Sequence, residues 1–311
     1  MNTPATTVSE STVAPQSNAS IVTPATHPFL WSVRREIWEN RSIYLAPIIV
    51  AIVGLIGYLL RIGSLPERRR AASLLDPVAQ RAAIAMPYEF AAMAIMLTAI
   101  IVGVFYSLDA LYGERRDRSI LFWKSLPVSD LTVVLSKAAM PLIVLPVVTF
   151  AIIIGTQLIM LLVSSAVLAI NGVSPASTWD NFPFFTQSGL VAYGIAVATL
   201  WHAPIYGWLL LVSGWVRRAA FLWAVMPVIM LGVLGKLLLN PGRFYPMVRD
   251  RLIGWAPRAF DFNVHETMTF DSMVQITPVR FLSAPGLWIG LAFFVAFLFA
   301  AVRVRRYRSS L

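Results

Sequence analysis

The 311-residue chain is strongly apolar: 58% of its residues are hydrophobic, only 13% are charged, and the mean hydropathy is +0.72. Because soluble domains carry about 25% charged residues, this composition excludes an ordinary soluble enzyme or binding domain. The net charge of +10 fits Lys and Arg gathered at the cytoplasmic face of a membrane, so we predict no nucleic-acid partner. The absence of cysteine excludes disulfides, thiol chemistry and thiolate metal sites.

The stretch before the first apolar run divides into two parts. Residues 1–26 are rich in Thr, Ser, Ala and Pro and carry one charge, so we predict a disordered tail. This tail has no basic start followed by an apolar core, so we do not expect a signal peptide. Apolar side chains then recur at helical spacing over 28–41, which predicts an amphipathic helix in the membrane interface. The residues expected to define this helix are Phe29, Trp31, Arg34, Arg35 and Trp38.

Six apolar runs reach or approach the roughly 20 residues that a helix needs to cross a bilayer. They predict an all-α polytopic membrane protein with a single transmembrane domain over residues 27–311. The third run extends as far as Asn171, so we expect its helix to tilt or to continue along the membrane surface. The six predicted spans are 43–61, 88–111, 138–163, 189–213, 219–239 and 286–303.

The basic residues of the loops predict which side of the membrane each loop faces, because cytoplasmic loops are richer in Lys and Arg. With the N-terminus inside, the inner side holds the larger share of these residues, including the tail RVRRYR at 303–308. The outer loop 171–188 then has none, whereas the outer run 68–70 opposes the assignment. We predict both termini in the cytoplasm. The outer segment 240–285 mixes apolar and charged residues, so we expect it to fold against the membrane.

A charged and then aromatic segment, GERRDRSILFWKSL, occupies Gly113–Leu126 between the second and third runs. A short helix that lies on the membrane surface, or that docks into another protein, would satisfy both its polar and its apolar half. An interfacial loop whose arginines extend to water is the alternative. The candidate contact residues are Glu114, Arg115, Arg116, Asp117, Arg118, Phe122, Trp123 and Lys124.

Few polar residues fall inside the predicted spans, and two of them are candidates for a substrate pathway. Gln157 and His202 each lie within an apolar run. Each is either a buried side chain bonded to a neighbouring helix or a group that faces the substrate. Glu89 and Asp109 lie at the two ends of the second run, where acids at the level of the lipid headgroups are expected.

Motifs for catalysis are absent from the sequence. It contains no GxxxxGK[ST] nucleotide-binding loop and no GxSxG nucleophile motif. His265 and Glu266 begin an HExxH pattern, but Thr269 stands where the second His is required. We therefore predict that this chain is not an enzyme and has no catalytic residue, metal site or cofactor of its own.

The stretch LYGERRDRSILFWKSLPVSDLTVVLSK, Leu111–Lys137, resembles the corresponding part of the permease subunits of bacterial type-2 ABC exporters. In that family a Glu-Arg pair opens an inner loop, an apolar helix leads to a Ser-Leu-Pro step, and a Lys begins the next span. The resemblance covers about residues 28–308. It implies a connecting helix, six spans, a cytoplasmic coupling helix between spans two and three, and a membrane-packed outer segment between spans five and six. The matching residues are Glu114–Arg115, Ile120–Trp123, Ser125–Pro127 and Lys137.

The same resemblance implies partners and a location. A separate ABC ATPase subunit, present in two copies, would bind ATP and Mg and receive the coupling helix. Glu114 and Asp117 would meet basic residues of the ATPase, and Phe122 and Trp123 would enter an apolar pocket. Two permeases, as a homodimer or a heterodimer, would complete an exporter in the bacterial cytoplasmic (inner) membrane. The residues themselves do not name the substrate.

Two other classes of function remain open at this level. An ion-driven secondary transporter would need acids or broken helices near the membrane midplane and paired repeats, whereas Glu89 and Asp109 lie at span ends. A membrane enzyme acting on lipid would need a convergent set of polar side chains. The outer segment offers Asp261, His265, Glu266 and Asp271 for such a set.

Overall fold

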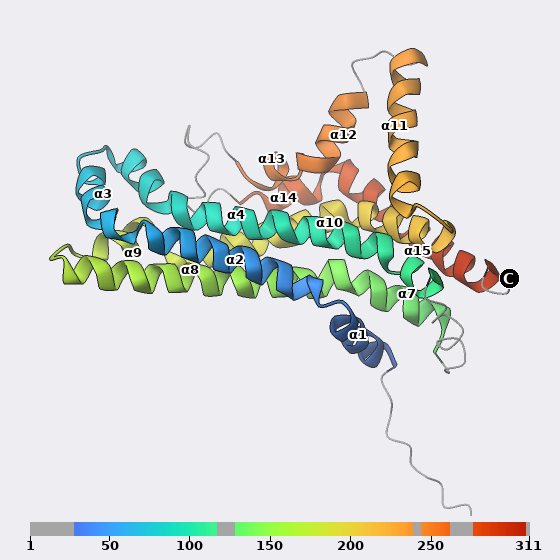
Figure 1. Ribbon diagram of the computed structural model, residues 1–311. Coiled ribbons are helices and arrows are strands. Elements are labelled where there is room, and N and C mark those ends of the chain that lie inside the picture. The colour runs from blue at the N-terminus through green and yellow to red at the C-terminus, as the bar shows by residue number, and fades with distance from the viewer. Residues whose placement is uncertain (1–27, 117–127, 239–243, 262–275, 309–311) are drawn as a thin grey trace, which may run out of the picture.

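The computed structural model of the chain describes residues 28–116, 128–238, 244–261 and 276–308. Every named element in these ranges is a helix (Figure 1), which confirms the all-α class; the predicted disordered tail lies outside them. The elements are α1 (Pro28–Glu39), α2 (Ser42–Leu60), η1 (Ile62–Ser64), α3 (Leu65–Ala72), α4 (Pro77–Asp109), α5 (Tyr112–Arg116), α7 (Asp130–Ala139), η2 (Met140–Val144), α8 (Leu145–Ile170), α9 (Ala176–Asn181), α10 (Phe184–Trp215), α11 (Ala220–Leu238), α12 (Phe244–Ile253), α13 (Ala256–Ala259), α14 (Pro278–Leu282) and α15 (Pro285–Arg308).

Five helical stretches of the described chain are long and apolar enough to cross a membrane, as the sequence predicts for a helical membrane protein. Each of them contains most of one predicted span. The predicted fifth span, 219–239, also forms a helix, α11, whose described apolar part is the shorter stretch Ala220–Met230. The five stretches are Ser42–Leu60, Pro77–Arg116, Asp130–Ile170, Ala176–Trp215 and Pro285–Tyr307.

The second span begins at Pro77, well before the predicted start at 88. Asp76 caps the helix, because its Oδ1 accepts hydrogen bonds from two backbone N–H groups of the first turn, each at 3.1 Å. Pro87, which the sequence presents as a break, lies inside the helix. Membrane helices tolerate such a proline when neighbouring helices pack around it, so the helix continues through Pro87 and includes the predicted span 88–111.

The third span is one continuous helical stretch made of α7, η2 and α8. Ser129 caps its start by accepting a hydrogen bond from the N–H of Thr132 at 3.1 Å. Within the span, η2 is a π-helical turn that contains Pro141, and Pro146 follows in the first turn of α8. A proline has no backbone N–H to donate, and a wider π turn is one way to absorb that defect.

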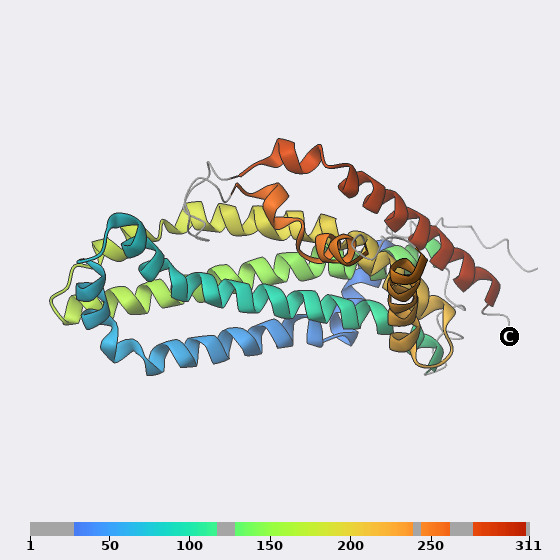
Figure 2. The same cartoon turned by 90° about the horizontal axis from the view of Figure 1, so that it is seen from above.

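The long helices form an elongated bundle with two distinct ends (Figures 1 and 2). We call the end that holds α1, α5 and the last turns of α15 the proximal end, and the end that holds α3 and α9 the distal end. The helices α2 and α8 run towards the distal end, whereas α4, α10 and α15 run towards the proximal end. The first and the last described helices therefore lie at the same end of the bundle.

Helix α10 is the central element of the bundle. In its most apolar window 67% of the residues are buried, against 17% for α2. Gly207 lets α15 approach α10 closely, since a Cβ at this position would lie 2.8 Å from the ring of Phe294. On α2, by contrast, Ile49, Val53 and Leu60 are exposed, as suits side chains that face lipid.

Helix α11 stands away from the bundle and crosses the direction of the other long helices (Figure 1), and Figure 2 looks nearly along its axis. The chain turns into it at Ala219, whose φ of 53° lies in the left-handed region that residues with a Cβ seldom adopt. Helix α12 then returns to the middle of α10, where the indole N–H of Trp201 donates to the backbone oxygen of Arg251 at 3.0 Å. The described parts of the predicted outer segment, 240–285, thus pack on the bundle.

Candidate functional site

A cluster of charged side chains, most of them buried, joins five helices at the proximal end. The residues come from α1, α5, α7 and α15, and Tyr106 of α4 adds its hydroxyl. Three are acids and three are bases, so their charges balance. We define the proximal ion cluster as Arg35, Glu36, Glu114, Asp130, Lys137 and Arg305.

The Glu36–Lys137 pair is the most deeply buried part of the cluster. The ammonium nitrogen of Lys137 lies 2.9 Å from Oε1 of Glu36, and the two side chains are 3% and 1% exposed. The Tyr106 hydroxyl donates to Oε2 of Glu36, also at 2.9 Å. Burial opposes ionisation of Glu36, but the charges of Lys137 and Arg35 outweigh it and hold the pKa of Glu36 below its ordinary value of 4.5. Glu36 therefore stays ionised at neutral pH, and its contact with Lys137 ties α1 to α7.

Glu114 connects this pair to the last helix. Its Oε1 lies 3.0 Å from Nζ of Lys137, and its Oε2 lies 2.6 Å from Nη1 of Arg305. Arg305 also contacts Asp130, with 3.0 Å between Nε and Oδ1. Glu114 lies just before the undescribed segment 117–127, and Asp130 lies just after it. One arginine of α15 therefore holds both flanks of that segment.

Arg115 ties α5 to the end of α10. Its Nη2 donates to the backbone oxygens of Ser213 and Val216, the latter at 2.8 Å. In addition, the N–H of Leu111 donates to the hydroxyl of Ser213 at 3.0 Å. Backbone oxygens at the C-terminus of a helix lack partners within the helix, and a cation satisfies them well. The turn after α4 is thus fixed to the centre of the bundle as well as to its edge.

The structure places three of the residues predicted to contact an ATPase. We expected Glu114 to face basic residues of a partner; it faces Lys137 and Arg305 of its own chain, and its side chain is only 9% exposed. Arg115 is also engaged within the chain, whereas Arg116 is exposed and lies 3.9 Å from Asp109. The other predicted contact residues lie outside the described residues, so their role stays a prediction: Asp117, Arg118, Phe122, Trp123 and Lys124.

Glu36, Asp130 and Arg305 are site residues that were not predicted from the sequence. A signal for Glu36 was present, because Val33 and Ile37 pack against the core and Glu36 lies on the same face of α1. A charge on the apolar face of an amphipathic helix requires a buried partner. No comparable local signal marks Arg305, which stands in a run of basic residues that reads as a cytoplasmic tail.

Helix α1 presents a second, outward face. Trp31 and Trp38 are 61% and 64% exposed, and the Arg34 guanidinium lies over both rings, 5.5 and 4.7 Å from their centres. Phe29 is exposed as well, whereas Arg35 turns inward to the ion cluster. The structure thus has a helix over 28–39 with one face packed on the bundle and the other exposed. Its contact with a membrane surface or an ATPase stays a prediction.

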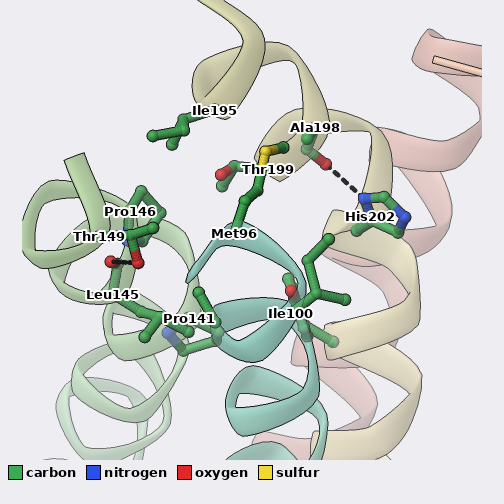
Figure 3. A pocket seen from close by; sticks show the side chains of 12 residues that line it. Met96, Ile100, Pro141, Leu145, Pro146, Thr149, Ile195, Ala198, Thr199 and His202 are labelled. Atoms are coloured by element: carbon green, nitrogen blue, oxygen red, sulfur yellow. Dashed lines mark hydrogen bonds between the residues drawn. The ribbon is translucent and has the colours of Figure 1, made fainter. Parts of the chain in front are cut away.

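A cavity lies among α4, α8 and α10, near the middle of the bundle (Figure 3). It has a volume of about 340 Å³, counted out to its open mouth. Its walls are mainly apolar, and the polar residues that line it are Thr149, Thr199, His202 and Tyr206. The π-helical turn contributes Pro141 to one wall.

His202 lines this cavity, but both of its ring nitrogens are engaged. Nδ1 lies 2.7 Å from the backbone oxygen of Ala198 (Figure 3), and Nε2 lies 3.0 Å from that of Leu252 in α12. A neutral imidazole donates through one nitrogen only, and the protonated ring donates through both. The hydrogen bonds give His202 the structural role that we weighed against substrate contact: it ties α12 to α10.

Gln157, the other candidate for a substrate pathway, is not among the residues that line the cavity. It is 2% exposed, and its Nε2 donates to the backbone oxygen of Tyr88 at 3.3 Å. Further along α8, the hydroxyl of Ser164 lies 2.5 and 2.9 Å from those of Tyr58 and Tyr88, and the buried Arg69 interacts with both tyrosines. We call Tyr58, Arg69, Tyr88 and Ser164 the distal tyrosine cluster.

Within the described residues, no group of three or more metal-binding side chains converges on one point. Of the polar set in the outer segment, only Asp261 is described; His265, Glu266 and Asp271 lie outside. No protein-family model, curated protein or solved structure matches the chain. The function is therefore inferred from the chemistry and geometry of the chain itself.

Proposed function

We propose that the chain is the membrane-spanning permease subunit of an ATP-driven exporter, coupled to a separate ATPase subunit at the proximal end. The observation that carries this proposal is the position of Arg305, which binds both Glu114 and Asp130. These two acids flank residues 117–127, the core of the segment expected to dock on the ATPase. A displacement of that segment is passed to α15 directly and to α1 and α7 through the rest of the proximal ion cluster.

Buried ion pairs suit such a mechanical joint. Separating the partners of a buried pair leaves an uncompensated charge and costs about 3–5 kcal/mol. The joined helices therefore move together as rigid elements, which is how packed helices transmit a change between two states. ATP and Mg belong to the partner in this proposal. As in the exporters that the sequence resembles, two ATPases and two permeases, identical or different, would make the working unit.

The parallel directions of α10 and α15 support a sixth crossing between them, although α11 lies across the other long helices in the structure. Gly286 lies beside Trp201, and Phe297 lies beside Trp208, so α15 runs in the same direction as α10. The chain must return towards the distal side between these helices, and α11 is the apolar helix in that connection. Six crossings place both termini on one side, and the basic residues of the proximal end favour the cytoplasm. We therefore propose a bacterial cytoplasmic (inner) membrane with both termini inside.

Purification of the tagged full chain from its native membranes tests the proposal. We expect an ATPase subunit to co-purify in nearly equal amount. Replacing Phe122 and Trp123 together by Ala should remove the ATPase while leaving the yield and thermal stability of the chain unchanged. The matched control replaces Phe185 and Trp288 by Ala, because these are an exposed Phe and an exposed Trp in the first turns of α10 and α15. This control should retain the ATPase.

Two outcomes would contradict the proposal in different ways. If the chain purifies without any ATPase, the proposal of an ATP-driven exporter is wrong. An ion-driven carrier or a membrane enzyme acting on lipid then takes its place. If the ATPase is present but remains bound after Phe122 and Trp123 are replaced, the segment 113–126 is not the docking element. The outward face of α1, with Trp31 and Trp38, is then the next surface to test.

A further inference from the structure

We propose that the cavity among α4, α8 and α10 binds an uncharged, mainly apolar molecule that forms a hydrogen bond with Tyr206. The inference deepens the proposed function, because it names the chemical class of cargo that the permease would carry, and in that respect it rests on the proposed function. Binding itself requires only this chain, so the two can be tested separately.

Tyr206 supplies an unused hydroxyl inside the bundle. The residue is 4% exposed and lines the cavity, and its hydroxyl forms no hydrogen bond with any described part of the chain. Polar groups inside proteins nearly always have a partner, and this hydroxyl can find one only in the cavity, either a water or a polar group of a bound molecule. Gly103 shapes this position, since a Cβ there would lie 3.1 Å from the Tyr206 hydroxyl oxygen.

The remaining polar groups of the cavity are either engaged or neutral. Both nitrogens of His202 lie against backbone oxygens, and the Thr149 hydroxyl donates to the backbone oxygen of Leu145 at 2.7 Å. None of the described residues that line the cavity is Asp, Glu, Lys or Arg. A carboxylate or ammonium group would be buried there without an opposite charge, which is unfavourable. The cavity therefore selects an uncharged molecule.

The position of the mouth indicates how such a molecule arrives. The space of about 340 Å³ includes the open region at the mouth, so a molecule whose hydroxyl group reaches Tyr206 keeps part of its chain on the flank of the bundle. Met96, Ile100 and Pro146 are only partly buried and form part of the rim. Their neighbours Leu97 and Val147 are 57% and 61% exposed on the outside of the bundle. Exposed apolar side chains thus lie beside the rim, and we infer that a molecule dissolved in the bilayer enters from the side.

The irregular part of the third span connects the cavity to the proximal ion cluster. Pro141 and Pro146 line the cavity, and neither has a backbone N–H to donate within the helix. Missing hydrogen bonds and a π-helical turn are places where helices bend. The same span carries Lys137 less than two turns before Pro141. A movement of the ion cluster would therefore bend the wall of the cavity.

Photolabelling of the full chain in lipid nanodiscs tests the site. The probe is a long-chain alcohol that carries a diazirine, compared with a hydroxyl-free alkane and a carboxylate of the same length. We expect saturable labelling of cavity residues by the alcohol, with a half-saturation concentration raised about 3–10-fold in Tyr206→Phe. Tyr193→Phe is the matched control, because this hydroxyl of α10 also lacks a hydrogen bond within the described residues and packs against Phe260 outside the cavity.

A second variant distinguishes loss of binding from unfolding of the chain. Thr199 lies at the partly exposed rim, so Thr199→Phe should fill the mouth and abolish saturable labelling at an unchanged thermal midpoint. The alkane should bind as weakly to the wild type as the alcohol binds to Tyr206→Phe, and the carboxylate should not bind. The inference is overturned if both variants are labelled like the wild type, if labelling spreads evenly over the exposed apolar residues, or if the carboxylate binds as well as the alcohol.

The same chemistry could come from a transported cargo or from a resident lipid chain. Accumulation of the alcohol in vesicles that hold the chain with its co-purified ATPase, dependent on ATP, would identify a cargo site. A lipid that is retained through purification and displaced by the alcohol would identify a resident lipid. Absence of an ATPase would overturn the proposed function but not the cavity, whereas loss of saturable labelling would overturn the cavity and leave the coupling proposal standing.

Discussion

The two ends of the bundle hold their buried polar groups together by different chemistry. At the proximal end, Glu36 and Lys137 are oppositely charged and almost completely buried. At the distal end, Tyr58 and Tyr88 share the hydroxyl of Ser164 through neutral hydrogen bonds. Loss of one partner of a buried ion pair leaves a charge uncompensated, whereas loss of one neutral hydrogen bond costs about 1 kcal/mol. The proximal end should therefore respond sharply to single substitutions, and the distal end should tolerate them.

Arg69 is a buried charge at the distal end, where the other buried polar groups are neutral. Its burial also bears on the basic run 68–70, which opposed the predicted orientation. Arg69 is 8% exposed and has no acidic partner among the described residues. Burial lowers the pKa of Arg69, while Tyr88 and Tyr58 act in the opposite direction. The run 68–70 weighed against the predicted orientation as free loop charge. The structure instead folds Arg69 against two tyrosines, so the number of basic residues in a loop overstates the charge that faces water.

Among the substitutions that compare the two ends, Lys137→Met should lower the free energy of unfolding most. It removes the cation from both Glu36 and Glu114, and we expect it to lower the free energy of unfolding by about 3–5 kcal/mol. Chemical unfolding in detergent micelles measures the change. Adding Glu36→Gln should recover part of the loss, because the stranded charge is then removed. A loss below about 1 kcal/mol in the single variant would show that the pair does not hold the proximal end together.

The substitution Arg305→Met should have the next largest effect, near the lower end of that range, about 3 kcal/mol. Glu114 loses a buried partner, but Asp130 is 28% exposed and keeps access to water. Arg303→Met is the matched control on the same helix, where the guanidinium lies over Phe299 and Tyr307 on the surface, and it should change stability by about 0.5 kcal/mol or less. Equal effects of the two variants would refute a special role for Arg305.

Acid should weaken the proximal end before the distal end. The pKa of Glu36 is lowered in the folded chain, so its contribution to stability is complete above its ordinary value of 4.5 and is lost as the pH falls through the lower folded value. The thermal midpoint, measured from pH 7 to pH 3, should therefore fall less steeply below pH 4.5 in Glu36→Gln. Glu39 is the control, because burial raises its pKa, and Glu39→Gln should not flatten this fall. If the thermal midpoint falls equally steeply below pH 4.5 in Glu36→Gln and in the wild type, Glu36 does not cause the loss of stability in acid.

The smallest effect is expected from Tyr58→Phe in the distal tyrosine cluster. It removes one neutral hydrogen bond, and Ser164 keeps its bond to Tyr88, so the loss should be about 1 kcal/mol. Tyr44→Phe on the same helix is the control, since the structure assigns its hydroxyl no hydrogen bond within the described residues. Unfolding in the same micelles measures both. A loss as large as that of Lys137→Met would erase the difference between the two ends.

The elements of the fold were largely predictable, whereas their boundaries and contacts were less so. The first span begins and ends within one residue of its predicted limits, because its apolar run is bounded by Arg41 and Arg61. The helix of the second span begins at Pro77, eleven residues before the predicted span, because it continues through Pro87. For the candidate site, the sequence pointed to the region around Glu114 but placed its partners on another protein. The cavity was not foreseen, since no single run reveals which faces of α4, α8 and α10 meet.

The sequence by itself determined that this is a helical membrane protein, because hydrophobicity over about 20 residues is a local property of the chain. It also determined the amphipathic character of α1, since helical spacing shows within a few turns. Only the tertiary structure decided which charges neutralise one another. Lys137 meets Glu36 across 101 residues, and neither carries a local mark of the other. An ion pair depends on the separation in space, which the bundle sets by packing its apolar faces.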